Sequence, residues 1–471
     1  MAQSVIMLEF NELSPRLMEE FIGKGLLPGF RRLRDESITA ITDAEEEGDA
    51  LEPWVQWTTA HTGLPYATHK VLKLSDGPNF RGTRVWDAVS DAGRKVWVCG
   101  SMNAAIRSDT IDGLVVPDPW ASNIDAHPSA FFAPYYHFVR SYVQGYTSET
   151  SPVTKADTVR FARFMVANGL SVKTVFDTLR QLAGEYGGLA KWRRAPILDR
   201  LQWDVFRHNY RRVQPTLSTF FLNSTAHYQH YYWRDLEPDL FTIKPSEDHL
   251  QSHKDAILFG YQKMDEIVQE ALSLAGPDTA VVLCTGLSQQ PMLRYEEEGG
   301  KQVFKSKDPE ALMALAAVPA GYRYVPVMAE EFQLHYTSEA DATEAQARLE
   351  ALKLQDGTPF MRVSREGDRV YAGCALIAHP GPEATIVTPH SNRSLLFATS
   401  FYGLEGVKSG MHHPDGLLWI RTPSRAHLEV ARKVSLEELA PTLMHLCGLD
   451  ASVFPRAPLA EVTALDVAVA A

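Results

Sequence analysis

Two histidines three residues apart follow an apolar run of strand length. The run Leu217–Leu222 is rich in β-branched and aromatic residues, which predicts a strand. The polar residues 223–225 then predict a turn into a helix that starts near Ala226. On such a helix His227 and His230 share one face, and two imidazoles at this spacing can bind one metal ion. The alternative is a polar helix start whose histidines bind no metal, because an isolated HxxH motif has low specificity.

The elements around these histidines alternate between buried strands and helices. Val5–Leu8, Val96–Cys99 and Ala280–Cys284 are apolar runs of strand length, and helical patterns separate them. This alternation predicts an α/β fold, with a mainly parallel sheet sandwiched by helices. Sheets of this kind bind ligands at the carboxyl ends of their strands, which is where Asn223 follows Leu217–Leu222.

The chain of 471 residues is long enough for a large core with insertions. We expect three core segments, 1–125, 205–325 and 376–471. The segment 126–204 has the pattern of a helical insertion. The segment 326–375 predicts a small α+β subdomain with the order strand, helix, strand, strand.

The amino-acid composition indicates which kinds of partner the protein binds. A formal net charge of -12 without a dense basic stripe argues against nucleic-acid binding, so we expect a small-molecule substrate. Four widely separated cysteines predict buried thiols in a reducing compartment. The sequence contains neither a signal peptide nor a run near the roughly 18 apolar residues of a membrane span. We therefore expect a cytoplasmic protein with no membrane partner, and the sequence leaves a homodimer open.

Several motifs follow the order of a known family. They are LPGFRRL from Leu27, P-x-x-x-W-T-x-x-x-T-G-L-P from Pro53, G-x-H-x-x-x-G-x-L from Gly410 and A-P-T-L from Ala440. In this order the chain resembles the alkaline phosphatase superfamily, in its phosphodiesterase and nucleotide-pyrophosphatase branch. The resemblance implies an alkaline-phosphatase-like α/β fold and a metal-dependent hydrolase. Members of the family usually hold two metal ions.

The resemblance also shows which family residues this chain has lost. The metal-binding Asp after the first strand falls on Asn11, and the nucleophile falls on Glu52 or Pro53. The Asp-His metal pair of the strand tip near residue 286 falls on Gly286 and Leu287. A divalent ion at these positions would lack anionic ligands, so one of the two metal sites is expected to be dismantled.

The other metal site keeps part of its ligands. The family's Asp on the HxxH-like segment falls on Ala226, whereas its two metal histidines fall on His230 and His412. His227 stands beside the lost Asp. We therefore predict one divalent ion, zinc first and iron or manganese as alternatives, bound by His227, His230 and His412. Glu52 is predicted nearby as general base or fourth ligand.

Two chemistries follow from one ion without a hydroxyl nucleophile. In the first, a hydrolase or transferase acts on a small phospho-, phosphono- or sulfo-ester-like metabolite through a metal-activated water. Glu52 would accept the proton, and Asn11 or Gln56 would stabilise developing charge. In the second, Glu52 and two histidines form a facial triad suited to Fe(II) and oxygen. A catalytically inactive binding protein is the third alternative.

The remaining candidates line the predicted site. We expect substrate contacts from polar or aromatic residues at the strand tips and in the segment from Leu51 to Pro65, namely Glu9, Trp54, Thr285 and Gln289. By contrast, His61, His69 and His413 are expected to be solvated or capping histidines.

Overall fold

A nine-stranded sheet forms the centre of the part of the chain that the structure describes. The structure, a computed structural model, describes residues 4–74, 76–107, 111–121, 123–145, 153–185, 191–328 and 330–464. The strand order is β19-β2-β18-β6-β1-β5-β3-β4, with β20 paired to β2. The strands are β1 (Ser4–Phe10), β2 (Ile38–Asp43), β3 (Val96–Cys99), β4 (Gly113–Val116), β5 (Leu217–Leu222), β6 (Thr279–Cys284), β18 (Asp415–Arg421), β19 (Leu428–Glu429) and β20 (Val434–Ser435).

The sheet is mainly parallel, as predicted. β1 pairs in parallel with β5 on one side and with β6 on the other, and β18 alone runs antiparallel to its neighbours β6 and β2. The register Phe10↔Leu222 brings the carboxyl ends of β1 and β5 level. The residues that follow these strands therefore meet at one edge of the sheet.

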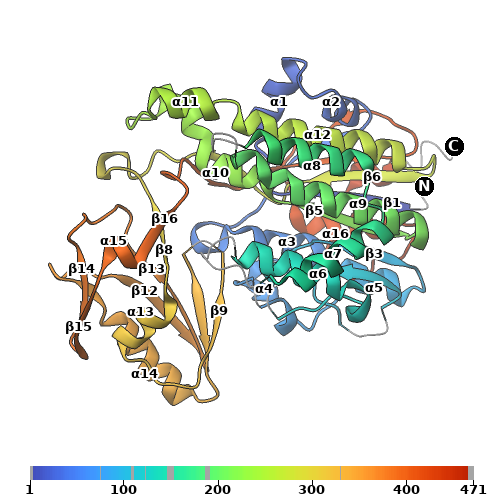
Figure 1. Ribbon diagram of the computed structural model, residues 1–471. Coiled ribbons are helices and arrows are strands. Elements are labelled where there is room, and N and C mark those ends of the chain that lie inside the picture. Colours follow the sequence, from blue (N-terminus) through green and yellow to red (C-terminus); the bar gives the residue numbers. More distant parts are fainter. Residues whose placement is uncertain are drawn as a thin grey trace.

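Helices cover both faces of the sheet (Figure 1), and each face has its own apolar core. One core contains Phe30, Trp203 and Tyr261, and the other contains Trp57 and Trp86. The helices of the first face are α1 (Pro15–Gly23), α2 (Pro28–Asp35), α6 (Ser129–Gly145), α9 (Ala195–Val213), α10 (Ser224–Leu236) and α12 (Ala256–Leu274). Those of the second are α3 (Pro53–Thr62), α5 (Val85–Asp91) and α16 (Leu439–Leu446).

Local sequence explains where several helices begin and end. Proline stands at the start of α1, α2 and α3, where its fixed φ favours the helix and its missing N–H costs nothing. Gly63 ends α3 with a left-handed φ of 63°. Two short helices, α4 (Tyr66–His69) and α11 (Glu247–His253), lie between the larger elements.

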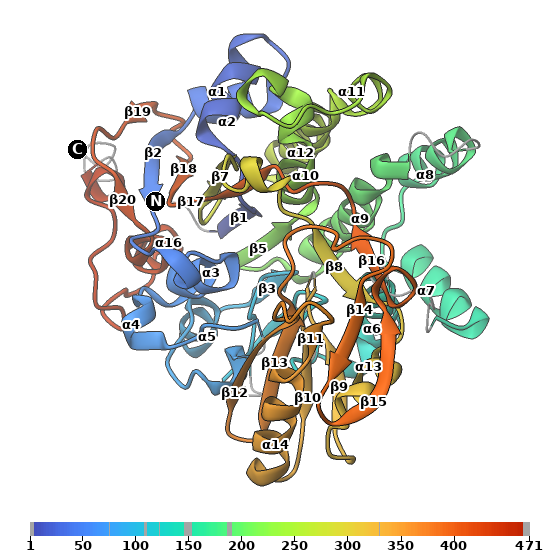
Figure 2. The same cartoon turned by 90° about the vertical axis from the view of Figure 1, so that its left-hand side faces the viewer.

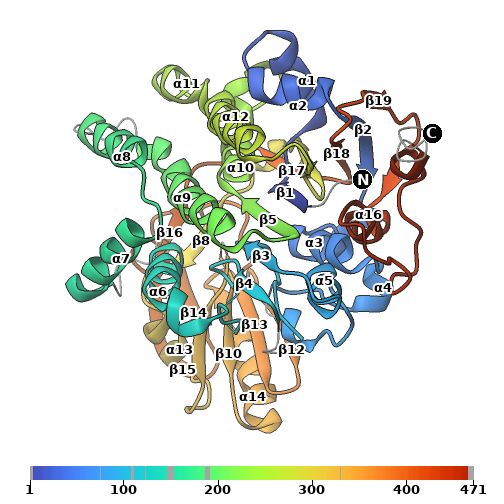
Figure 3. The ribbon, with the colours of Figure 1, turned by 90° about the vertical axis from the view of Figure 1, so that its right-hand side faces the viewer.

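The helical insertion contains α6, α7 (Lys155–Ala167), α8 (Val172–Gly184) and α9. Its last helix continues to Val213, beyond the predicted boundary at residue 204. Figures 2 and 3 show α7 and α8 at the side of the molecule, away from the central sheet. Within the described residues, no helix is long and apolar enough to cross a membrane.

A smaller unit of antiparallel strands lies beside the central sheet (Figure 1). Its core extends from Phe304 to Phe401, so it is larger than the predicted subdomain 326–375. Inside it, β10, α14, β12 and β13 lie where a strand, a helix and two strands were predicted, and the short strand β11 lies between α14 and β12. Its elements are β8 (Val303–Ser306), α13 (Pro309–Ala316), β9 (Arg323–Pro326), β10 (Phe332–His335), α14 (Glu339–Glu350), β11 (Lys353–Leu354), β12 (Met361–Glu366), β13 (Arg369–Cys374), β14 (Thr385–Thr388), β15 (Ser391–Leu396), α15 (Phe397–Ser400) and β16 (Phe401–Leu404).

A two-stranded ribbon connects the two halves of the chain near the sheet edge. β7 (Ser288–Pro291) pairs antiparallel with β17 (Gly410–His413), and His412 lies opposite Gln289. Ser409 N–H also donates to the carbonyl of His230, which attaches the ribbon to α10. The ribbon therefore carries His412 to the end of the β5–α10 segment.

Candidate metal centre

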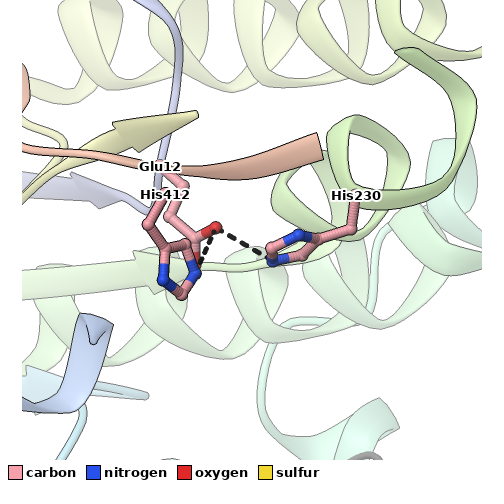
Figure 4. A group of neighbouring side chains, drawn as sticks. All are labelled: Glu12, His230 and His412. Atoms are coloured by element: carbon pink, nitrogen blue, oxygen red, sulfur yellow. Dashed lines mark ion pairs between the residues drawn. The ribbon is translucent and has the colours of Figure 1, made fainter. Parts of the chain in front are cut away.

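Three side chains from distant parts of the sequence meet at the carboxyl edge of the sheet. Glu12 lies just beyond β1, His230 lies on α10 and His412 lies on β17. Glu12 Oε2 is 3.2 Å from His230 Nε2 and 3.4 Å from His412 Nε2. Figure 4 shows the Glu12 carboxylate between the two imidazole rings. The candidate ligand atoms of all three residues lie within 4.8 Å of one another.

The outer nitrogens of both histidines contact backbone carbonyls. His230 Nδ1 is 3.2 Å from the oxygen of Gly410, and His412 Nδ1 is 2.9 Å from the oxygen of Leu51. A carbonyl can only accept, so each Nδ1 donates a proton, and each ring directs its Nε2 atom at Glu12. Metal-binding histidines commonly show this arrangement, because the second hydrogen bond fixes the tautomer and the ring orientation.

The residues around Glu12 fix its carboxylate. Asn11 Nδ2 donates to Glu12 Oε1 (2.6 Å), and Gln289 Nε2 donates to Glu12 Oε2 (2.5 Å). Gln229 Nε2 donates to the carbonyl of Glu12 (2.6 Å). The backbone of Glu12 has a φ of 63°, which is strained for a residue other than glycine. The hydrogen bonds hold this conformation, and they fix the carboxylate between the two histidines.

The charges of the three groups are coupled. Burial alone would raise the pKa of Glu12, but His412 and His230 outweigh it and hold that pKa well below its usual value. Burial opposes protonation of His412, yet the Glu12 carboxylate raises the pKa of this histidine above its ordinary value. Burial, together with the positive charge of Lys408, lowers the pKa of His230 to about 4. His230 therefore stays neutral at pH 7, as a metal ligand must.

Of the three predicted histidines, the structure brings together His230 and His412 but not His227. The Nε2 atom of His227 is instead 3.5 Å from Glu405 Oε1, and its ring is 32% exposed. Glu52, the predicted base or ligand, has its Oε2 atom 3.7 Å from His412 Nδ1, on the side of the ring opposite to Nε2. Glu52 is therefore near the cluster of Glu12, His230 and His412, but on the far side of the His412 ring.

The positions of the predicted dismantled site are occupied by protein packing. Trp57 Nε1 donates to the amide oxygen of Asn11 (2.8 Å), and Asn11 Nδ2 also donates to Asn223 (2.8 Å). A Cβ added at Gly286 would lie 3.1 Å from the Trp57 ring. The Asn11 amide is fully hydrogen-bonded within the protein, so it has no free donor for developing charge on a substrate.

The other predicted residues have mainly structural contacts. Gln56 is buried and donates to the carbonyl of Ala50 (2.9 Å), which positions the loop before α3. Thr285 accepts from the Leu417 N–H (2.8 Å), and Trp54 donates to the carbonyl of Leu72 (2.7 Å). Gln289, which binds Glu12 directly, is the predicted substrate contact that lies in the cluster.

Two of the histidines that were expected to be solvated or capping, His61 and His69, are buried. His61 Nε2 is 2.7 Å from Glu9 Oε1, and both side chains are almost inaccessible, so Glu9 is not available to a substrate either. His69 accepts from the Val71 N–H and contacts Thr59 Oγ1. His413 does cap, as predicted, because its Nδ1 accepts from the Asp415 N–H (3.1 Å).

The sequence prediction missed two charged residues of the site. Glu12 was recognisable as an acidic residue at a strand tip, directly beside Asn11, but the direction of its side chain depends on the positive φ. Lys408 lies four residues before His412 and forms no ion pair with any described residue. Burial and the neighbouring Lys301 lower the pKa of Lys408, while Glu52 and Glu12 raise it.

We compared the chain with known proteins. No family model and no curated protein matches the sequence. Among solved structures, it is similar to murine ectonucleotide pyrophosphatase/phosphodiesterase 5, with 10% identity, a TM-score of 0.40 and coverage of 98% of this chain and 99% of that chain. It is also similar to phosphonoacetate hydrolase from Sinorhizobium meliloti 1021 in complex with phosphonoformate, with 11% identity, a TM-score of 0.39 and coverage of 95% and 96%.

Proposed function

We propose that the protein is a metal-dependent hydrolase in which Glu12, His230 and His412 hold one divalent ion. The observation that supports this proposal is the meeting of two imidazole Nε2 atoms and one carboxylate oxygen. The ligands of a tetrahedral zinc ion about 2.1 Å away lie roughly 3.4 Å apart. The distances of 3.2 and 3.4 Å from Glu12 to the histidines fit this spacing.

Two histidines and one glutamate form a catalytic rather than a structural zinc set, because three protein ligands leave a fourth position open. An ion held there would supply a water with a pKa of about 7 and would polarise an ester oxygen. In this proposal Glu12 takes the place that the sequence analysis gave to His227. Among the described residues, packing by Asn223, Trp57 and Gly286 leaves no ligand set for a second ion beside Asn11, where the family holds one.

Glu52 is a carboxylate that lies next to the proposed ligand set, with its Oε2 atom 3.7 Å from His412 Nδ1. Burial raises the pKa of Glu52, with Glu12 adding to the rise and His412 and Lys408 opposing it. A raised pKa suits a general base, which works best near the operating pH. Because Glu52 lies on the Nδ1 side of His412, away from the Nε2 atom that would bind the ion, we assign it the role of base and not that of fourth ligand.

The positive charge of Lys408 favours an anionic substrate. The ammonium group lies in the electrostatic field of Glu12, Glu52 and both histidines of the cluster, without an ion-pair partner among the described residues. A phospho-, phosphono- or sulfo-ester carries the charge that this group would bind. We therefore propose a small metabolite of this class as the substrate.

The same ligand set supports a second function. Two histidines and one carboxylate also form the facial triad of mononuclear Fe(II) enzymes that use oxygen. To separate the two, protein stripped with a chelator would be reloaded with zinc, manganese or iron and assayed on phospho-, phosphono- and sulfo-esters with and without oxygen. We expect ester hydrolysis with zinc or manganese that does not depend on oxygen. Turnover only with iron and oxygen would overturn the hydrolase proposal, and absence of a bound ion would favour a binding protein.

A further inference from the structure

Helix α8 directs its apolar side outward. Five large apolar side chains recur along it at a spacing of three or four residues, and all are exposed: Val172 (87%), Val175 (40%), Phe176 (63%), Leu179 (61%) and Leu182 (47%). A helix on the surface of a globular protein normally buries such a stripe against the core. The orientation of α8 is therefore the reverse of the usual one.

Polar contacts hold α8 in this orientation. The Ser171 N–H at its start donates to Asp204 Oδ2 on α9 (2.8 Å), and Lys173 Nζ donates to Glu266 Oε2 on α12 (2.9 Å). Thr174, on the same side as these contacts, is only 1% exposed. Within the described residues, polar contacts thus fix one side of α8, and its apolar side is exposed.

The exposed apolar surface extends to the neighbouring helix. Val166 on α7 is 73% exposed and Val159 is 49% exposed. Eight of the thirteen exposed large apolar residues of the described chain lie between residues 142 and 182. Figures 2 and 3 show α7 and α8 projecting together from one side of the molecule. Apolar surface exposed in this way on two helices at the same side of the molecule indicates an interaction surface.

The same segment is basic in an acidic protein. Residues 126–213 contain 13 Lys and Arg against 6 Asp and Glu, whereas the rest of the chain contains 33 against 52. A cavity of about 330 Å³ beside the α7–α8 loop is lined by Gly169, Arg207, His208, Arg211 and Arg212. Arg207 is paired with Asp204, and the lining keeps a net positive charge.

We propose that α7, α8 and the basic end of α9 form a docking surface for a membrane that contains anionic lipids. Apolar side chains that enter the headgroup region, surrounded by Lys and Arg, are the known requirements for such binding. A contact between two copies of this surface would bring two basic segments together, so the charge favours a lipid surface over a dimer. We predicted no membrane partner because the sequence has neither a signal-peptide pattern nor a membrane-spanning run, and a peripheral contact requires neither feature.

Cosedimentation with vesicles tests this proposal. The full chain would be mixed with vesicles of phosphatidylcholine alone or with added phosphatidylglycerol, at low and high salt. We expect binding to the anionic vesicles that weakens as salt screens the basic residues. Val172→Asp, at the first position of α8 where an acidic residue favours the helix, should weaken binding about tenfold or more.

Val453→Asp is the matched control, because Val453 is 54% exposed and lies outside the docking surface. It should bind vesicles like the unchanged protein. Arg211→Gln should weaken binding without altering the apolar stripe. Equal binding of Val172→Asp and Val453→Asp, or equal binding to neutral and anionic vesicles, would overturn the proposal. So would a concentration-dependent dimer that Val172→Asp dissociates in the absence of vesicle binding, since the occupant would then be a second copy.

Discussion

The two ring nitrogens of His412 separate two roles. Its Nε2 atom lies 3.4 Å from Glu12 Oε2, while Nδ1 lies 2.9 Å from the Leu51 carbonyl and 3.7 Å from Glu52 Oε2. One ring therefore connects the candidate ligand set to the candidate base. The sequence indicated His412 and Glu52 through motif positions, but it could not show which side of the ring each carboxylate occupies.

Replacement of the base tests this separation of roles. We expect Glu52→Gln to keep the bound metal, because Glu52 is outside the proposed ligand set, and to lower kcat about 10²- to 10⁴-fold. Metal analysis and steady-state kinetics on the same preparation would measure both. Glu47→Gln is a suitable control, since Glu47 is an exposed acid of the same loop. Loss of metal from Glu52→Gln would identify Glu52 as a ligand.

Replacement of the Lys408 ammonium group tests the substrate class. Lys408→Met should raise KM for an anionic ester about 10- to 100-fold, because a hydrogen bond to a charged group would be lost. The exposed Lys307, changed to Met, serves as the control and should leave KM unchanged. An unchanged KM in Lys408→Met, with the metal still bound, would contradict an anion-binding role.

The elements that hold the site differ in how well local sequence predicts them. The strand Leu217–Leu222 and the helix behind it follow from residue patterns, and β5 and α10 match them. The β7–β17 ribbon does not, because it pairs residues near 290 with residues near 411. Such pairing depends on the rest of the fold, so the sequence could not show that Gln289 would face His412 and bind Glu12.

The β7–β17 ribbon packs so closely against α10 at Gly410 that no Cβ fits there. A Cβ at Gly410 would lie 2.2 Å from the Gln229 carbonyl oxygen and 2.5 Å from Gln289 Oε1. We expect Gly410→Ala to lower the free energy of unfolding by about 1–3 kcal/mol and to weaken metal binding by displacing His412. Gly406→Ala is the control, because a Cβ there meets no atom within 4 Å. Thermal unfolding of both variants would measure the difference, and equal stability would refute the packing argument.

At the scale of the whole molecule, the sequence predicted the sheet and its helices. It did not predict which polar side chains are buried. Continuous apolar runs such as Val96–Cys99 identify core strands without ambiguity. Polar residues inside helices give no such signal. His61 and His69 are buried because the second core closes around α3 and α4, and each finds a hydrogen-bond partner there. Their burial is a property of the assembled fold.

Burial of His69 makes stability depend on pH. Burial, with Arg84 and Lys70 nearby, lowers the pKa of His69 to about 4, from about 6.5 in the unfolded chain. The folded state therefore binds fewer protons between these values, so this contribution is complete above about pH 6.5 and is lost as the pH falls toward 4. It amounts to about 3 kcal/mol. Chemical denaturation of the unchanged protein and of His69→Gln at several pH values should show a flatter profile for the variant; parallel profiles would contradict it.

The central claim is that Glu12, His230 and His412 hold one metal ion, and metal content measures it most directly. Protein purified without chelator should contain about one equivalent of a divalent ion. His230→Ala, His412→Ala and Glu12→Gln should lose it while remaining folded by circular dichroism. His227→Ala, which removes the neighbouring histidine that faces Glu405, should keep it. Absence of metal from the unchanged protein, or equal loss from His227→Ala, would contradict the assignment.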